Sequence, residues 1–361
     1  MGNDVAPAQC REVLILNLNT FAAKNVSQIR LMQEEGYDFT IVTHDSQSRS
    51  RQIFEDSGFR RSKLVILGGG IAKVSRSIAF LLRRWHHVEL YPAGRMAILY
   101  LLAIKLLRHR LLVIERGDID SLEYYDRLTR LSLKLAYRLA DCVVYKETYM
   151  EARLKAFTNA PLAFIPNCIE SRAPSPKDNR PIDFLWVNRV IPQRRPEWVA
   201  EALGDPRLAG RELLMLGVEP EAELESHLSD RQRLIGSTVA TGVSIRGFVD
   251  PTPYYGKSRF FCLPATVVFG NNALLEAMAS GVVPIVTEAP GVDLIIENGV
   301  NGFVTAFDES EYRDVMVRAA GLTAEEWQTM SGKAVETVRE NYSPQTWTRR
   351  MAAVYDRLNA A

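Results

Sequence analysis

Short apolar runs alternate with helix-like stretches along this chain, and the alternation occurs in two separate series. Several runs are apolar without interruption, as in strands that are covered on both faces. Such alternation predicts βαβ units and parallel sheets. A stretch rich in Pro, Ser and charge at 171–181 separates the two series and predicts a linker. We therefore expect an α/β protein with two Rossmann-like, doubly wound domains at 1–170 and 182–340.

The expected elements follow from these runs. Strands are predicted at Val13–Asn17, Phe39–Thr43, Leu64–Leu67, Val88–Tyr91, Leu111–Ile114, Cys142–Tyr145, Ala163–Pro166, Ile182–Val187, Glu212–Leu216, Ser244–Arg246, Phe260–Leu263, Val283–Val286 and Gly302–Val304. Helices are predicted at Asn25–Glu35, Ala72–Arg84, Met96–Arg108, Leu122–Leu139, Glu197–Ala202 and Ala273–Ala279. Two further helices are expected after 324, and the last, at 341–361, would pack back on the first domain. Two doubly wound domains would face a cleft, with ligands beyond the carboxyl ends of the strands.

Composition narrows the classes of function. Four Cys and five His show no metal-binding spacing, so no His/Cys metal site is expected. The first residues lack a secretory signal and no run of 18 apolar residues occurs, which predicts a cytoplasmic protein. Residues 1–175 hold 25 Lys or Arg against 18 Asp or Glu. This excess indicates an anionic partner, either a membrane surface or a phosphorylated acceptor, or it is a chance asymmetry of a dimerising protein. Basic residues are not interleaved with aromatics, so nucleic acid is not expected.

The most informative segment is Phe269–Gly281, in which a Gly-Asn-Asn turn opens a helix directly after a predicted strand. Backbone N–H groups at a helix start attract negative ligands. Gly270, Asn271 and Asn272 therefore form a candidate diphosphate cradle, and Glu276 could bind the hydroxyls of a ribose. The plainer interpretation is a helix cap followed by a solvated Glu.

A second constellation runs from Asn188 and Arg189 to Arg194 and Arg195, after the first strand of the second domain. Guanidinium groups on such a loop suit a bidentate grip on phosphate. Exposed loop charge is the alternative interpretation.

Together these segments resemble the retaining GT-B glycosyltransferases of family 4, the group 1 glycosyl transferases. The resemblance rests on segments in the order that the family has them, best matched over 140–305 and weakly over the first 110 residues. They are FIPNCIE at 164–170, Val187–Arg195, GFVD at 247–250, Phe269–Gly281, APGVD at 289–293 and GVNGF at 299–303.

The resemblance implies a role for each matching residue. Arg189, Arg194 and Glu276 would be catalytic, with the two arginines on the donor diphosphate and Glu276 on the ribose. Donor binding would involve Asn188, Gly247, Phe248, Gly270, Asn271, Asn272, Leu275 and Asp293. Arg116 and Asp118 would contact the acceptor or the donor sugar.

The sequence departs from the family at several positions. Val268 falls where the family's first motif Glu grips the donor sugar, and Asn188 replaces the usual Gly. Asn19–Ala22 stands in place of the Gly-Gly loop, and Glu115–Asp118 follows a strand where a His is common. These departures affect sugar and acceptor contacts more than the nucleotide site.

Asp118-Ile119-Asp120 has the pattern of a metal-binding DxD, but it lies far in sequence from the phosphate elements. We therefore expect neither a metal nor a cofactor. The expected activity is metal-independent, retaining transfer of a hexose from a UDP-sugar, with GDP-mannose second, to a glycan, lipid-linked or small-molecule acceptor. Such activity belongs to polysaccharide biosynthesis, in the cytoplasm or peripherally on the inner face of a membrane. The alternative is a catalytically inactive nucleotide-sugar-binding or scaffold protein of the same fold.

Overall fold

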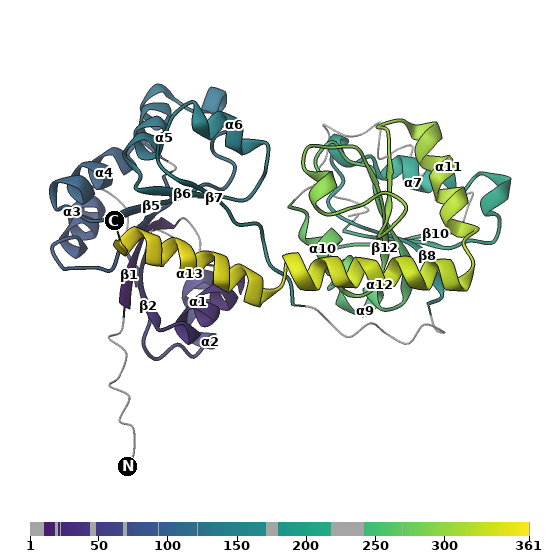
Figure 1. Cartoon of the computed structure of the whole chain (residues 1–361), viewed down its shortest axis with the longest axis horizontal. Helices are drawn as coiled ribbons and strands as arrows, with labels where there is room; N and C mark the ends of the chain where they lie inside the picture. Colours follow the sequence, from purple (N-terminus) through teal and green to yellow (C-terminus); the bar gives the residue numbers. More distant parts are fainter. Residues whose placement is uncertain are drawn as a thin grey trace, which may run out of the picture. The chain divides into compact units, whose positions relative to one another are not determined.

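The computed structural model describes residues 11–18, 21, 23–43, 48–67, 71–92, 94–120, 122–170, 180–217, 242–268 and 270–360. Most of the predicted linker, Phe269 and three residues of Asn19–Ala22 lie outside these ranges. The chain divides into two compact units, unit 1 with Met1–Pro166 and Trp347–Ala361, and unit 2 with Asn167–Thr346 (Figure 1). The chain therefore passes from one unit to the other twice.

Unit 1 is built on a parallel sheet with the order β3-β2-β1-β4-β5-β6-β7 among the described residues. Its strands are β1 (Arg11–Leu18), β2 (Tyr37–Thr43), β3 (Lys63–Ile66), β4 (Val88–Leu90), β5 (Leu111–Ile114), β6 (Cys142–Tyr145) and β7 (Leu162–Phe164). Its helices are α1 (Ala23–Glu34), α2 (Ser48–Asp56), α3 (Ile71–Phe80), α4 (Ala97–Leu106), α5 (Arg127–Leu139) and α6 (Met150–Lys155). In the register, Leu14 pairs with Val88, and Val13 with Phe39. The inner strands are mostly buried because helices cover both faces, whereas the edge strands β3 and β7 are only partly buried.

Unit 2 repeats this design with the strand order β10-β9-β8-β11-β12-β13. The strands are β8 (Ile182–Val187), β9 (Leu213–Leu216), β10 (Val243–Arg246), β11 (Ser258–Leu263), β12 (Val283–Thr287) and β13 (Phe303–Thr305). The helices are α7 (Pro196–Ala202), α9 (Thr252–Tyr255), α10 (Asn272–Ala279), α11 (Glu309–Ala320) and α12 (Ala324–Asn341). Phe184, Trp186, Phe260 and Cys262 of the two central strands lie in one buried cluster with residues of α7 and α11.

The predicted α/β class with two parallel sheets is confirmed, and the bounds of β5, β6 and β8 agree at both ends. Helices α2, α6, α9 and α11 were not predicted. The helix predicted at Leu122–Leu139 is wrong at its start, where a 3₁₀ turn spans Leu122–Tyr124. The α-helix begins at Arg127 because the Asp126 carboxylate accepts hydrogen bonds from the N–H groups of Leu128 and Thr129.

Two long helices end the chain, as expected. Helix α12 begins with a capping box in which Thr323 and Glu326 bond each other's backbone N–H groups. Helix α13 (Pro344–Ala360) belongs to unit 1 from Trp347 onward (Figure 1). There the buried Tyr355 hydroxyl donates to Glu89 of β4, and Asp356 pairs with Arg11 at 2.9 Å. The end of the sequence thus contributes to the core of the unit that begins it.

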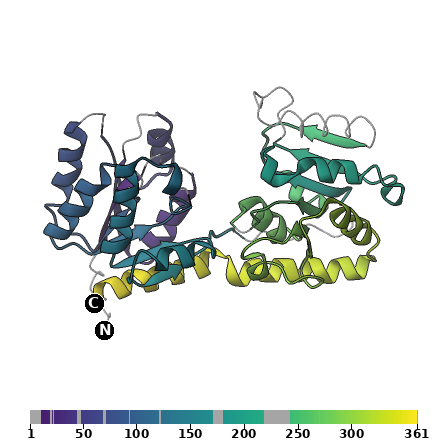
Figure 2. The same ribbon diagram turned by 90° about the horizontal axis from the view of Figure 1, so that it is seen from above.

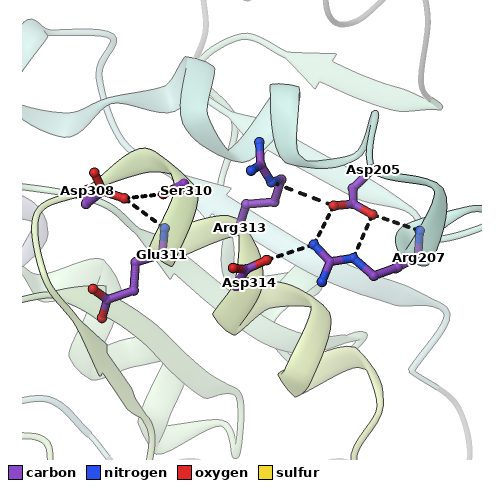
Figure 3. A network of polar contacts seen from close by, with 7 residues as sticks. All are labelled: Asp205, Arg207, Asp308, Ser310, Glu311, Arg313 and Asp314. Carbon is purple, nitrogen blue, oxygen red and sulfur yellow. Dashed lines mark hydrogen bonds and ion pairs between the residues drawn. The ribbon is translucent and has the colours of Figure 1, made fainter.

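An ion-pair network stabilises unit 2 (Figure 3). Arg207 binds Asp205 through two nitrogens at 2.7 and 3.0 Å and reaches Asp314 of α11 at 2.7 Å. The Arg207 hydrogen bonds lower the pKa of Asp205 to about 2. Arg313 approaches the same carboxylate at 3.7 Å, so the network ties α11 to the loop before β9. Asp308 caps α11 beside it, accepting from the Glu311 N–H at 2.9 Å.

Candidate functional site

The strand order of unit 2 defines where a ligand would bind. Strands β9 and β10 extend the sheet on one side of β8, while β12 and β13 extend it on the other side of β11. All pairings are parallel, so the carboxyl ends of the strands meet at one edge. In open α/β sheets, ligands bind at the point where the strand order reverses, which here lies between β8 and β11.

Three residues of the predicted site meet at this switch point. Arg194 donates from its guanidinium to the side-chain oxygen of Asn188, which directly follows β8. The Asn271 amide, on the loop after β11, donates to the same oxygen at 3.2 Å. Two donors fix the orientation of the Asn188 amide, and its nitrogen is buried without a hydrogen-bond partner among the described residues. A buried donor of this kind requires an acceptor, which a ligand oxygen would supply.

The loops that carry these residues are fastened by backbone contacts. The Thr266 N–H, after β11, donates to the Gln193 carbonyl at 3.0 Å. Gly217, after β9, has φ +84°, and a Cβ on it would lie 2.3 Å from the Asn188 carbonyl oxygen. Its N–H donates at 3.0 Å to the carbonyl of Gly247. A glycine is therefore needed at 217 for both its conformation and the close approach.

The two arginines differ in their surroundings. Arg189 is exposed, whereas Arg194 is partly buried. Burial lowers the pKa of Arg194, and the nearby charge of Arg189 lowers it further. Two cations close together repel, so an anion between them would be bound favourably.

Helix α10 begins at the same edge of the sheet. The Asn271 side chain caps it by accepting from the Leu274 N–H at 3.1 Å, and Gly270 supplies the turn with φ +73°. The first N–H groups of a helix carry partial positive charge. Asn271 thus links the start of α10 to the pair Asn188–Arg194.

Glu276 lies on the next turn of α10 and is partly buried. Its carboxylate accepts from the hydroxyl of the buried Tyr255, at the end of α9, at 2.9 Å. The contact fixes the orientation of a carboxylate that could accept hydroxyl hydrogens.

The other predicted donor-binding residues have less specific surroundings. Phe248 is exposed, and its ring lies 3.7 Å from where a Gly217 Cβ would stand. Asn272 accepts from the Asn167 amide at 2.8 Å. Leu275 is buried, so only its backbone could meet a ligand, and Asp293 is exposed in the turn after β12.

Val268, which the resemblance aligns with the first motif Glu of group 1 glycosyl transferases, has a completely buried side chain. Its neighbour Val267 is 52% exposed. The loop after β11 therefore presents an apolar side chain, Val267, to solvent.

Arg116 and Asp118 belong to unit 1, after β5. In the sheet of unit 1, the strand order reverses between β1 and β4, and β5 lies next to β4. Asn17 of β1 donates to the carbonyl of Tyr91, after β4, at 2.6 Å. The Arg116 guanidinium lies 5.3 Å from the centre of the Tyr91 ring, which places it near this second switch point. Asp118 accepts from the Tyr125 hydroxyl at 2.8 Å.

A further carboxylate near this edge, that of Glu147 after β6, was not predicted. It is 8% exposed, and one of its oxygens has no hydrogen-bond partner among the described residues. Burial raises the pKa of Glu147 to about 7, and the charge of Asp120 acts in the same direction. In the sequence, the only sign that Glu147 belongs near this edge is its position just after a predicted apolar strand. Gly217 and Tyr255 were missed for a similar reason, because their roles depend on non-local contacts.

The two carboxylates of the DxD-like segment bind different partners. Asp118 is bound to Tyr125, and Asp120 pairs with Arg153 at 3.2 Å. Within the described ranges, no group of three or more His, Cys, Asp or Glu side chains could hold a metal ion.

A protein-family comparison matches unit 2. Residues 181–320 match the family described as Glycosyl transferases group 1, which covers most of unit 2 and none of the unit 1 sheet. No curated protein matches the chain.

Solved structures show the fold. Anabaena HepE in complex with UDP-glucose is 14% identical, with a TM-score of 0.73 over 96% of this chain and 99% of that one. Sucrose-phosphate synthase of Thermosynechococcus elongatus is 15% identical, with a TM-score of 0.70 over 97% and 99%. The pneumococcal O-GlcNAc transferase GtfA, solved with UDP and GlcNAc, is 10% identical, with a TM-score of 0.72 over 97% and 99%. The chain has the GT-B fold, and the fold and the family match together support a GT-B glycosyltransferase.

Proposed function

We propose that the protein is a retaining, metal-independent glycosyltransferase that moves a hexose from a nucleoside-diphosphate sugar to a hydroxyl acceptor. The observation that carries the proposal is the hydrogen-bonded set Asn188, Arg194 and Asn271 at the switch point of unit 2. This set combines a partly buried cation, a buried amide donor and the start of a helix. Each of these features favours a diphosphate.

The chemistry follows from the leaving group. Cleavage of the sugar–phosphate bond leaves negative charge on the nucleoside diphosphate. Arg189, Arg194 and the N–H groups at the start of α10 would stabilise that charge as it develops. The sugar would pass through an oxocarbenium-like transition state. The departing phosphate oxygen would take the proton of the attacking hydroxyl on the same face, which retains the anomeric configuration.

The remaining donor contacts are assigned in the same way. Glu276, held by Tyr255, would accept hydrogen bonds from the ribose hydroxyls. Gly247 and Phe248 would lie near the base, and Asn272, Leu275 and Asp293 would contribute mainly through backbone. Two neighbours, HepE and GtfA, were solved with UDP, and HepE also with UDP-glucose, which supports a UDP-sugar donor ahead of GDP-mannose. In unit 1, Arg116 and Asp118 would contact the acceptor or the sugar.

Val268 favours one alternative, a nucleotide-sugar-binding protein without catalytic activity. The carboxylate that grips the donor sugar in related enzymes would be missing, while the diphosphate contacts would remain. An active transferase and an inactive protein would both bind the nucleotide-sugar, but only the transferase would turn it over.

Calorimetric titration with UDP, GDP and ADP, each with and without EDTA, tests the site. We expect selective, EDTA-insensitive binding of one nucleotide. Arg194→Ala should weaken it, while Arg339→Ala, an exposed arginine on α12, should not. Release of UDP from UDP-sugars in the presence of an acceptor then tests turnover. Arg194→Ala should lower kcat/KM about a hundredfold, which corresponds to a loss of roughly 3 kcal/mol of transition-state stabilisation.

Each outcome has a defined meaning. Absence of binding to every nucleotide would refute the site. Binding without turnover on a broad panel of donors and acceptors would favour the inactive alternative. An inverted product anomer, observed by NMR, would refute retention.

A further inference from the structure

The outer side of helix α4 has an unusual composition for a surface helix. Its inner side buries Ala97, Tyr100, Leu101 and Ile104. Its outer side carries leucines as well, with Leu102 56% and Leu106 83% exposed. The outer face of a helix that only covers a sheet is normally polar.

Neighbouring helices also carry exposed leucines. Helices α3, α4 and α5 pack side by side (Figure 2). Leu82, just after α3, is 74% exposed, and Leu128 and Leu131 of α5 are more than half exposed. Large exposed apolar areas often mark interaction sites, so these leucines form a candidate interaction surface. We call the set Leu82, Leu99, Leu102, Leu106, Leu128 and Leu131 the leucine surface.

The charges beside the leucine surface are mostly positive, although the exposed Asp126 lies two positions before Leu128. Residues 71–110 hold eight Lys or Arg and one acidic residue, the buried Glu89. Helix α5 holds four Lys or Arg and no acidic residue. Exposed arginines stand within two positions of the leucines, namely Arg84 after Leu82, Arg108 after Leu106 and Arg127 before Leu128.

We infer that the leucine surface docks unit 1 on a membrane that contains anionic phospholipids. Leucines on adjacent helices can enter the boundary between headgroups and acyl chains, and flanking arginines attract phosphate headgroups. The charge pattern favours this occupant over a second copy of the chain, since two such surfaces would repel each other. None of the described helices is long and apolar enough to cross a membrane. Docking of this kind does not require an active transferase.

Vesicle co-sedimentation with the full chain tests this inference. We expect binding to phosphatidylcholine vesicles that contain phosphatidylglycerol, weaker binding to phosphatidylcholine alone, and loss of binding at high salt. The double variant Leu102→Ser/Leu106→Ser should reduce the partition coefficient about tenfold or more. Arg84→Glu/Arg127→Glu should do so as well.

Matched controls distinguish the effect of the leucine surface from effects of overall hydrophobicity and net charge. Val300→Ser replaces an exposed apolar residue of unit 2, and Arg339→Glu/Arg349→Glu makes the same change in net charge elsewhere. Both controls should bind like the wild type. All the altered side chains are exposed, so melting temperatures should stay unchanged. Leu128→Ser/Leu131→Ser repeats the test on another helix if the α4 variant fails to fold.

Three results would overturn the inference. One is the absence of binding to anionic vesicles at low salt, and another is equal binding by the surface variants and the wild type. The third is a concentration-dependent dimer that the α4 variant abolishes, which would assign the leucine surface to a second copy of the chain. Nucleotide titration of the same samples keeps this result separate from the transferase proposal.

Discussion

Replacement of Gly217 by Ala should disturb the candidate nucleotide site through its backbone. Gly217 has φ +84°, and a Cβ would lie 2.3 Å from the Asn188 carbonyl oxygen. The left-handed conformation costs an alanine roughly 1 to 2 kcal/mol, and an overlap with fixed backbone adds roughly 1 to 3 kcal/mol. We therefore expect Gly217→Ala to lower the free energy of unfolding by roughly 2 to 5 kcal/mol.

Gly210 provides a matched control in the same unit. Its φ is +79°, and a Cβ there would meet no atom within 4 Å. Gly210→Ala should therefore lose only the conformational part, about 1 to 2 kcal/mol. Urea unfolding of the full chain measures both losses, with the m-values compared to detect a change in cooperativity.

The same pair of variants tests the site. The overlap at 217 must displace Asn188, whose side chain holds Arg194 and Asn271 in place. UDP titration should show weaker binding for Gly217→Ala and unchanged binding for Gly210→Ala. Equal losses of stability together with equal UDP affinity would refute the argument that the approach of Gly217 shapes the site.

Three further changes have defined outcomes. Glu147→Gln should flatten the pH dependence of stability. In the wild type, the pKa of Glu147 is about 7 in the folded state and 4.5 when unperturbed, so the folded state holds the proton more tightly. The free energy of unfolding should therefore fall by about 3 kcal/mol as the pH rises from 4.5 through 7, and the variant should lack this fall. Urea midpoints at pH 5 and pH 8 measure this, and equal slopes in variant and wild type would contradict it. Asn271→Asp should keep the cap of α10 but lose the hydrogen bond to Asn188, and both this loss and charge repulsion should weaken UDP binding, so unchanged affinity would separate Asn271 from the diphosphate. Thr323→Ala removes the α12 capping box and should lower the free energy of unfolding by about 1 kcal/mol while leaving UDP affinity unchanged. Weaker UDP binding by this variant would show that a general loss of stability is enough to lower the measured affinity.

The sequence predicted the strands best, because buried strands of a parallel sheet are short and continuously apolar. Strand β8 was predicted at both of its ends. Helices α9 and α11 were missed for different reasons. Helix α9 is a single turn, and α11 is an amphipathic helix whose apolar side is recognisable mainly from the core that it covers. The start of α5 was misplaced because Asp126 begins a helix where the apolar pattern continues upstream.

The candidate site was predictable where it depends on strand ends. Asn188, Arg194 and Asn271 follow β8 and β11, and parallel pairing brings those ends together without any knowledge of side-chain contacts. The hydrogen bonds among them could not be predicted, since they depend on the loop conformation after each strand. This explains the significance of Asn188, which the resemblance to group 1 glycosyl transferases aligns with a Gly. A glycine could not join the arginine of one loop to the cap of α10, so this chain orders the two loops of the candidate site with a side chain. The same substitution makes Asn188→Gly an informative variant. It should restore the family residue yet loosen Arg194, and UDP affinity no lower than that of the wild type would show that the side-chain link is dispensable for binding.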